Sequence, residues 1–201
     1  GGDMVLAFDS SGEEVLRLPG YGITGNSAYI SNGMIVDENT PLVLYTGHED
    51  KALDASDYAS AQIGIYSLKD RKWIVEPARQ SVTLFTDSVY MIGSDVGNLY
   101  RIDGTCIEEG AEDVTVQGNF IISRRVVYDK TGQRLTMIQE NENVWTVLYD
   151  EILINQYFPD GSHYTKCVNA QGEPIWIEQS GLTWTGGEDG WRIYNSWNDT
   201  N

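Results

Sequence analysis

Histidine, cysteine and basic residues are scarce in this chain of 201 residues. It holds 2 His and 2 Cys, and its 13 Lys and Arg stand against 30 Asp and Glu, which gives a formal net charge of −17. A surface with this much negative charge repels the phosphate backbone that nucleic-acid-binding proteins must neutralise. We therefore exclude DNA and RNA as partners. The acidity favours cations or basic protein segments, and it is also typical of a surface that only keeps a protein soluble.

Long apolar runs and helical periodicity are also missing. No run approaches the roughly 20 apolar residues that a membrane helix needs, and no dozen residues place apolar side chains at i, i+3, i+4 and i+7 between capping signals. We therefore predict a chain with neither a membrane span nor long helices. The sequence shows no signal peptide, and Gly1 and Gly2 are typical of residues left by a removed tag.

The two cysteines, Cys106 and Cys167, match neither a CxxC redox pair nor a zinc-binding set. One pair in a chain of this length is not a disulfide framework. We expect two free thiols, with one isolated disulfide as the alternative.

Short strands separated by polar turns make up most of the chain. Each strand alternates large apolar residues with polar ones, and the turns carry the Gly, Asp and Asn that tight hairpins require. Five such turns have similar flanks, around Gly12, Asp70, Gly104, Gly132 and Gly172. Their mean spacing of about 40 residues, with β signals only, is typical of a propeller blade of four strands.

The two ends of the sequence each supply half of such a blade. LTWTGG and GWRIYNSW near the C-terminus read as its first two strands, and MVLAFD and EEVLRL near the N-terminus read as its last two. Joining these halves would remove two open sheet edges. We therefore predict an all-β, five-bladed β-propeller, a single domain over residues 1–201, closed by N-terminal strands that pair with C-terminal strands.

Two stretches carry a family resemblance. SVYMIGSDVGNLYRIDGTCIEE (Ser88–Glu109) resembles the repeat of the quinoprotein-like (PQQ-like) β-propellers, and VYDKTGQRL (Val127–Leu135) has the same second half, which is also similar to the bacterial WG repeat. The other blades match only as generic hairpins. Because the dedicated quinone and calcium residues of the larger family members have no counterpart here, the resemblance implies a non-enzymatic scaffold more than a dehydrogenase, without a quinone cofactor.

Catalytic and metal-binding patterns are weak. Only His48 and His163 could act as an imidazole base, and there is no G-x-S-x-G motif. Asp50, Asp54 and Asp57 are spaced so that a folded loop could gather oxygens around a calcium ion, and the same spacing is typical of a solvated acidic loop. We expect no catalytic residues, and calcium at these three aspartates is the one cofactor considered.

In a propeller, the loops between second and third strands and the connections between blades emerge on one side. Here that side is rich in carboxylates with aromatic residues at its margin. The residues predicted for a ligand or partner face are Tyr58, Asp95, Glu140, Glu142, Phe158 and Asp160. The alternative is a rim that is merely solvated.

These observations favour a non-catalytic binding or scaffold module, because rigid folds position the loops that bind. We expect a monomer in a secreted or envelope-attached bacterial protein, extracellular or in the cell envelope, with a basic protein segment or a glycan as partner. One alternative is a small carbohydrate-binding or glycoside-processing propeller. Another is a purely structural domain of a longer chain.

Overall fold

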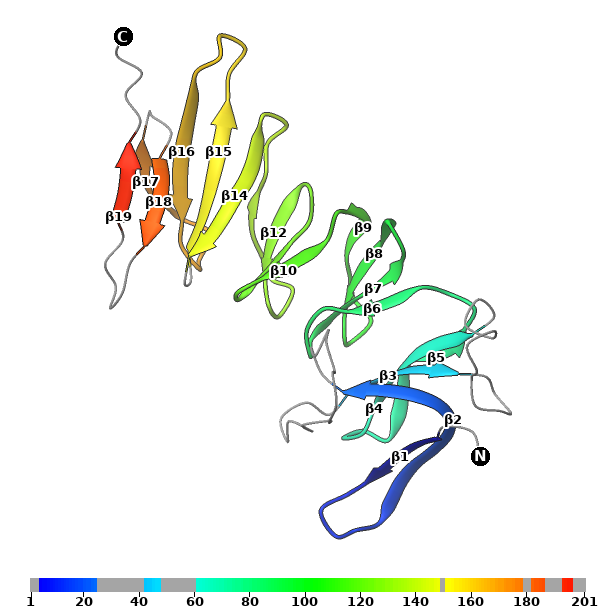
Figure 1. Ribbon diagram of the computed structural model, residues 1–201. Helices are drawn as coiled ribbons and strands as arrows, with labels where there is room; N and C mark the ends of the chain where they lie inside the picture. The colour runs from blue at the N-terminus through cyan, green and yellow to red at the C-terminus, as the bar shows by residue number, and fades with distance from the viewer. Residues whose placement is uncertain are drawn as a thin grey trace. The chain divides into compact units, whose positions relative to one another are not determined.

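The computed structural model describes residues 4–24, 42–47, 61–148, 151–178, 182–186 and 193–196, and its regular elements in these ranges are all β-strands (Figure 1). In chain order the strands are β1 (Met4–Phe8), β2 (Glu14–Thr24), β3 (Leu42–Gly47), β4 (Gln62–Ser67), β5 (Lys72–Ala78), β6 (Val82–Leu84), β7 (Val89–Gly93), β8 (Val96–Arg101), β9 (Cys106–Glu112), β10 (Thr115–Gln117), β11 (Phe120–Ile122), β12 (Val126–Asp129), β13 (Arg134–Met137), β14 (Glu142–Leu148), β15 (Glu151–Tyr157), β16 (His163–Val168), β17 (Pro174–Glu178), β18 (Leu182–Gly186) and β19 (Ile193–Ser196). The ranges contain no helix long and apolar enough to cross a membrane.

The chain divides into two compact units. The first comprises Gly1–Glu112 with the turn Lys130–Gly132, and the second comprises Asp113–Asp129 with Gln133–Asn201. The first unit contains a five-stranded sheet, β1-β2-β3-β4-β5, and a four-stranded sheet, β6-β7-β8-β9. The second contains the sheets β10-β11-β12-β13 and β14-β15-β16-β17 and the two-stranded sheet β18-β19. All strand pairs are antiparallel neighbours in sequence, so the prediction of an all-β chain is confirmed.

The predicted closed propeller is wrong. Within the described ranges β1 pairs with β2 alone and β19 pairs with β18 alone, so the sheets are separate and no strand exchange closes a ring. The reason lies in β2, which is 11 residues long. Its first part pairs with β1 up to Pro19, and from Gly20 onward it pairs with β3, so the first hairpin joins the sheet that follows it.

One five-residue turn closes five of the hairpins. In each, the first residue donates its backbone N–H to the carbonyl oxygen of the fifth residue over 2.9 Å. The fourth residue is a glycine with φ between +80° and +88°, the left-handed conformation of a three-residue hairpin loop with a bulge. The five turns are Asp9–Glu13, Arg101–Thr105, Asp129–Gln133, Phe158–Ser162 and Asn169–Glu173.

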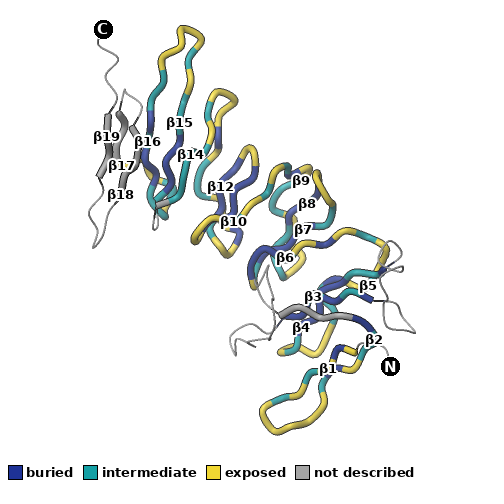
Figure 2. The backbone as a smooth tube through the Cα atoms, in the orientation of Figure 1, coloured by how far each residue is buried: buried dark blue, intermediate teal, exposed yellow. Residues whose placement is uncertain are grey.

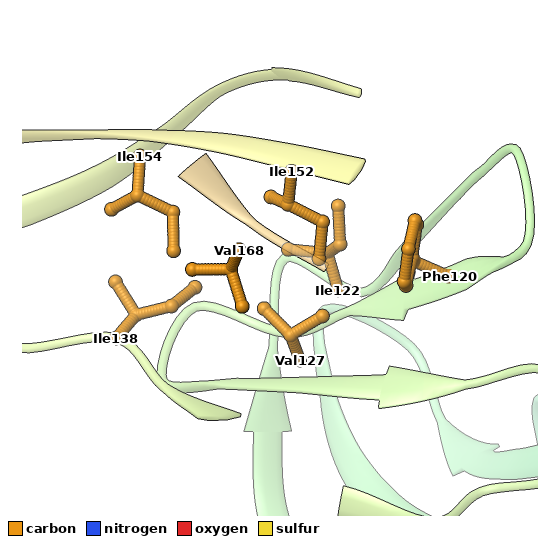
Figure 3. Close-up of a cluster of buried hydrophobic side chains, with 7 residues drawn as sticks. All are labelled: Phe120, Ile122, Val127, Ile138, Ile152, Ile154 and Val168. Atoms are coloured by element: carbon orange, nitrogen blue, oxygen red, sulfur yellow. The ribbon is translucent and has the colours of Figure 1, made fainter. Parts of the chain in front are cut away.

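Many buried residues lie on the inner strands of the sheets (Figure 2), and their side chains form separate clusters. One cluster joins β3–β5 to β6 and β7 in the first unit and includes Leu42, Ile65 and Tyr90. A second joins the two four-stranded sheets of the second unit, where Phe120, Ile122, Val127 and Ile138 face Ile152, Ile154 and Val168 (Figure 3). Each such side chain contributes about 1.5–3 kcal/mol by leaving water. Each four-stranded sheet is therefore stabilised through the apolar face that it shares with its neighbour.

Candidate functional site

The structure brings four of the six residues predicted for a ligand face together. Glu140, Glu142, Phe158 and Asp160 lie at one end of the β14–β17 sheet. Asp95 lies exposed in the turn between β7 and β8, which belongs to the other unit. Tyr58 and the three aspartates of the predicted calcium loop, Asp50, Asp54 and Asp57, lie outside the described residues.

Backbone and side-chain hydrogen bonds hold this end of the β14–β17 sheet together. The Tyr157 N–H donates to the Asn141 carbonyl oxygen over 2.8 Å, and the Asn141 Nδ2 donates to the Tyr157 carbonyl oxygen over 2.9 Å. These bonds fix the segment before β14 against the end of β15. They place Glu140 and the Phe158–Ser162 turn at the same sheet end.

Glu142 has a structural role instead of the predicted place on an exposed acidic face. Its side chain is only 3% exposed, and its Oε1 accepts a hydrogen bond from Lys166 Nζ over 2.6 Å. Its Oε2 accepts the backbone N–H of Gln139 over 3.0 Å. A carboxylate so enclosed and neutralised is not available to a partner, because a buried ion pair is stable only with its hydrogen bonds satisfied.

Asp160 caps its own turn and keeps an exposed charge. Its Oδ1 accepts the Ser162 hydroxyl over 2.6 Å and the Ser162 backbone N–H over 2.9 Å. These two hydrogen bonds, the hydroxyl first, lower the pKa of Asp160 below the ordinary aspartate value, since they stabilise the ionised form. The carboxylate is therefore charged at neutral pH.

Aromatic side chains flank this charge, and sequence reasoning identified only one of them. Tyr157 stacks on His163 with ring centroids 6.0 Å apart, and Phe158 meets Tyr164 edge to face at 5.2 Å. Tyr157 is 47% exposed. The signal that would have found them is the cross-strand pairing of aromatic residues in a hairpin. We call Glu140, Tyr157, Phe158 and Asp160 the acidic hairpin end.

A second feature is a hollow of about 260 Å³ in the five-stranded sheet. Its lining comes from four strands: Leu18 of β2, Tyr45 of β3, Gln62 of β4, and Trp73, Glu76 and Pro77 of β5. None of these residues was predicted as a site residue. Because the lining residues are far apart in the sequence, they form no local motif that sequence analysis could detect.

The aromatic wall of this hollow is held in place by contacts on two sides. Trp73 packs edge to face against Tyr45, with ring centroids 5.6 Å apart, and against Tyr66 at 5.1 Å. The Tyr45 hydroxyl donates to the Pro19 carbonyl oxygen over 2.7 Å. The described lining of the hollow also contributes an amide from Gln62 and a carboxylate from Glu76.

The remaining candidates from the sequence are the metal-binding groups and the two cysteines. The described residues contain no group of three or more His, Cys, Asp or Glu side chains that could hold a metal ion. Both cysteines are free thiols in the structure: Cys106 is exposed and Cys167 is buried. The Cys167 Sγ lies 3.3 Å from Glu151 Oε2 and donates to it.

Comparisons with protein-family models, with curated proteins and with solved structures each found no match. The resemblance to quinoprotein-like and WG repeats therefore stays a prediction from the sequence. Function has to be argued from the two surface features above.

Proposed function

We propose that this chain is a non-catalytic binding module whose ligand is a small neutral polyol, such as a sugar, held in the hollow of the five-stranded sheet. The observation that carries the proposal is the cavity itself, where the Trp73 indole lies beside the polar side chains of Gln62 and Glu76. This is the carbohydrate-binding alternative from the sequence, now with a specific site.

The chemistry of the lining suits such a ligand. Aromatic side chains offer a large apolar face with little conformational freedom to lose, and the C–H face of a sugar ring can pack on it. An amide and a carboxylate can then accept and donate the hydrogen bonds that sugar hydroxyls require. The net charge of −17 favours neutral sugars over uronic acids or sugar phosphates.

Binding without hydrolysis follows from the count of carboxylates in the lining. Glycoside hydrolysis ordinarily needs two carboxyl groups on either side of the bond that breaks. Among the described residues that line the hollow, Glu76 alone carries one. We therefore infer recognition and not turnover at this site.

The test is titration of a panel of neutral mono- and disaccharides, followed by calorimetry and saturation-transfer NMR. We expect Glu76→Gln to weaken binding several-fold and Trp73→Ala to weaken it about tenfold or more, since tenfold corresponds to about 1.4 kcal/mol. Glu76 is exposed, so its variant should fold normally. Tyr157→Ala, which removes an exposed aromatic residue of the other unit, is the control and should bind like the wild type. Binding by no sugar of the panel, or equal binding by all variants, would contradict the proposal.

The acidic hairpin end supports a second function, the docking of a basic protein segment. Asp160 retains its charge beside the half-exposed Tyr157, an arrangement that can pair a lysine or arginine with both a carboxylate and an aromatic face. Such a contact is electrostatic and would weaken as salt rises. The extracellular or envelope location stays a prediction from the sequence.

A lysine-rich peptide tests this second function. We expect Asp160→Asn to lower its affinity several-fold and to reduce the dependence of binding on salt. The control is Asp103→Asn, because Asp103 occupies the same position in the Arg101–Thr105 turn and its Oδ1 likewise accepts a backbone N–H, that of Thr105, over 2.9 Å. Equal losses in both variants would show non-specific attraction to an acidic protein and would remove the hairpin end as a site.

A further inference from the structure

Three outer strands of the described sheets lack the features that protect sheet edges. An exposed edge presents unpaired backbone N–H and C=O groups, and proteins ordinarily block it with charges, proline or very short strands. The outer strands β5, β9, β13, β14 and β17 all contain a charged residue, and β6 and β10 are only three residues long. By contrast β1 (MVLAF), β18 (LTWTG) and β19 (IYNS) contain neither charge nor proline.

The β1–β2 hairpin has the geometry of the second half of a four-stranded sheet. Its turn, Asp9–Glu13, has the same backbone hydrogen bond as the turns that join the third and fourth strands of the second unit's sheets, Asp129–Gln133 and Asn169–Glu173. In all three the first side chain also accepts the N–H of the fifth residue, over 2.9–3.0 Å.

The strand register repeats this likeness. The pairing jumps by one extra residue just before the turn at Ala7/Phe8, at Val127/Tyr128 and at Cys167/Val168. A β-bulge at one fixed position is a specific local feature. β1 therefore corresponds to the third strand of a four-stranded sheet. The part of β2 that pairs with β1 corresponds to the fourth strand.

The β18–β19 hairpin has the geometry of the first half of such a sheet. In the β14–β15 pair the register shifts between Val144 and Thr146, which leaves one extra residue on the first strand. In the β18–β19 pair it shifts in the same way between Trp184 and Gly186. β19 is therefore a second strand, and in every complete four-stranded sheet the second strand pairs antiparallel with the third.

We propose that β19 of one copy of this chain pairs antiparallel with β1 of another copy, which completes a four-stranded sheet β18-β19-β1-β2 between the two. Among the described strands β1 pairs only with β2 and β19 only with β18, so each has one backbone edge without a described partner strand. The apolar face of β1 supports the same partner, because Met4, Leu6 and Phe8 are 45%, 42% and 58% exposed. This inference is independent of the proposed function, and it replaces the expectation of a monomer.

The contact is heterologous, since two different edges meet. Two copies that exchange both contacts would form a closed dimer, and copies that exchange one each would form an open chain. Either product uses the same strand pair. Its signature is a molar mass that rises with protein concentration together with protection of two particular strands.

The experiment combines light scattering with hydrogen exchange on the intact protein. We expect the molar mass to rise as concentration increases from low micromolar to near-millimolar, and the backbone amides of β1 and β19 to exchange more slowly at high concentration. A constant monomer mass would overturn the proposal. Association that leaves the exchange of these two strands unchanged would overturn it as well, because the copies would then meet through another surface.

A charged side chain placed on β1 tests the proposed pairing, and the same charge placed on another outer strand is its matched control. Leu6→Lys should abolish the increase in mass, whereas Met137→Lys, which places the same charge at a 49% exposed position on the outer strand β13, should not. Because Leu6→Lys leaves β18–β19 intact, adding this variant to the wild type should shorten or dissociate the assemblies. Equal behaviour of the two variants, or no effect of the mixture, would contradict the pairing of β19 with β1.

Discussion

Gly172→Ala is expected to destabilise the β14–β17 sheet by about 2–4 kcal/mol, whereas Gly161→Ala in the same sheet is expected to cost only about 1–2 kcal/mol. Both glycines occupy the fourth position of the same five-residue turn. Their φ values are +80° and +86°, so an alanine at either position pays the same penalty for left-handed backbone. The pair therefore separates backbone strain from packing.

The difference lies in what a new Cβ would meet. At Gly172 it would lie 2.3 Å from the carbonyl oxygen of Leu135 and 2.7 Å from its carbonyl carbon, both backbone atoms on β13. Because the contacted atoms belong to the backbone, the clash can be relieved only if β13 or the Asn169–Glu173 turn moves. At Gly161 no other atom lies within 4 Å of the added carbon. Only the first substitution forces the Asn169–Glu173 turn away from β13.

Urea denaturation, read through hydrogen exchange of peptides from β13 to β17, measures both variants against the wild type. We expect the exchange of β13 and β17 to accelerate in Gly172→Ala and to change little in Gly161→Ala. Equal destabilisation by the two alanines would mean that the Asn169–Glu173 turn does not pack against β13.

Ile152→Ala is expected to destabilise the second unit by about 2–5 kcal/mol, the cost of emptying a buried aliphatic site. Ile152 is fully buried in the cluster between the β10–β13 and β14–β17 sheets, opposite Phe120 and Ile122 (Figure 3). Loss of its side chain removes apolar contacts on both sheets. A cavity remains unless the two sheets move closer to each other and fill it.

Ile175→Ala is the matched control for this substitution. Ile175 is the same residue type in the same sheet, on β17, and it is 43% exposed. Because much of its side chain already contacts water, its removal should cost about 1 kcal/mol or less. The same denaturation measurement compares the two. Similar losses would show that the packing between these sheets contributes little to stability.

The turns and most strands could be predicted from sequence because their causes are local. A turn such as Asp129–Gln133 needs a glycine at its fourth position, and its first residue, an Asp, accepts the N–H of the fifth; both residues are visible in five consecutive letters. Short runs of consecutive apolar residues, Val89–Ile92 and Ile152–Ile154, likewise identify β7 and β15 directly. These features depend on neighbours a few residues away.

Pairing between distant segments was not readable in this way. Closure failed because β2 continues past Pro19 to pair with β3, a choice that depends on residues far along the chain. Glu142 was assigned to an exposed face because its partner Lys166 is 24 positions away. The hollow beside Trp73 was missed for the same reason, since its lining runs from Leu18 to Pro77.

In the described part of the chain the buried side chains form several small cores, and no two of these cores share a buried residue. Within each unit, stability should therefore be distributed over separate cores that can open locally. A destabilising substitution in one core should loosen the sheets that form that core more than the others, so unfolding should proceed in steps. A substitution in one core can therefore change the stability of that core with little effect on the stability of the others.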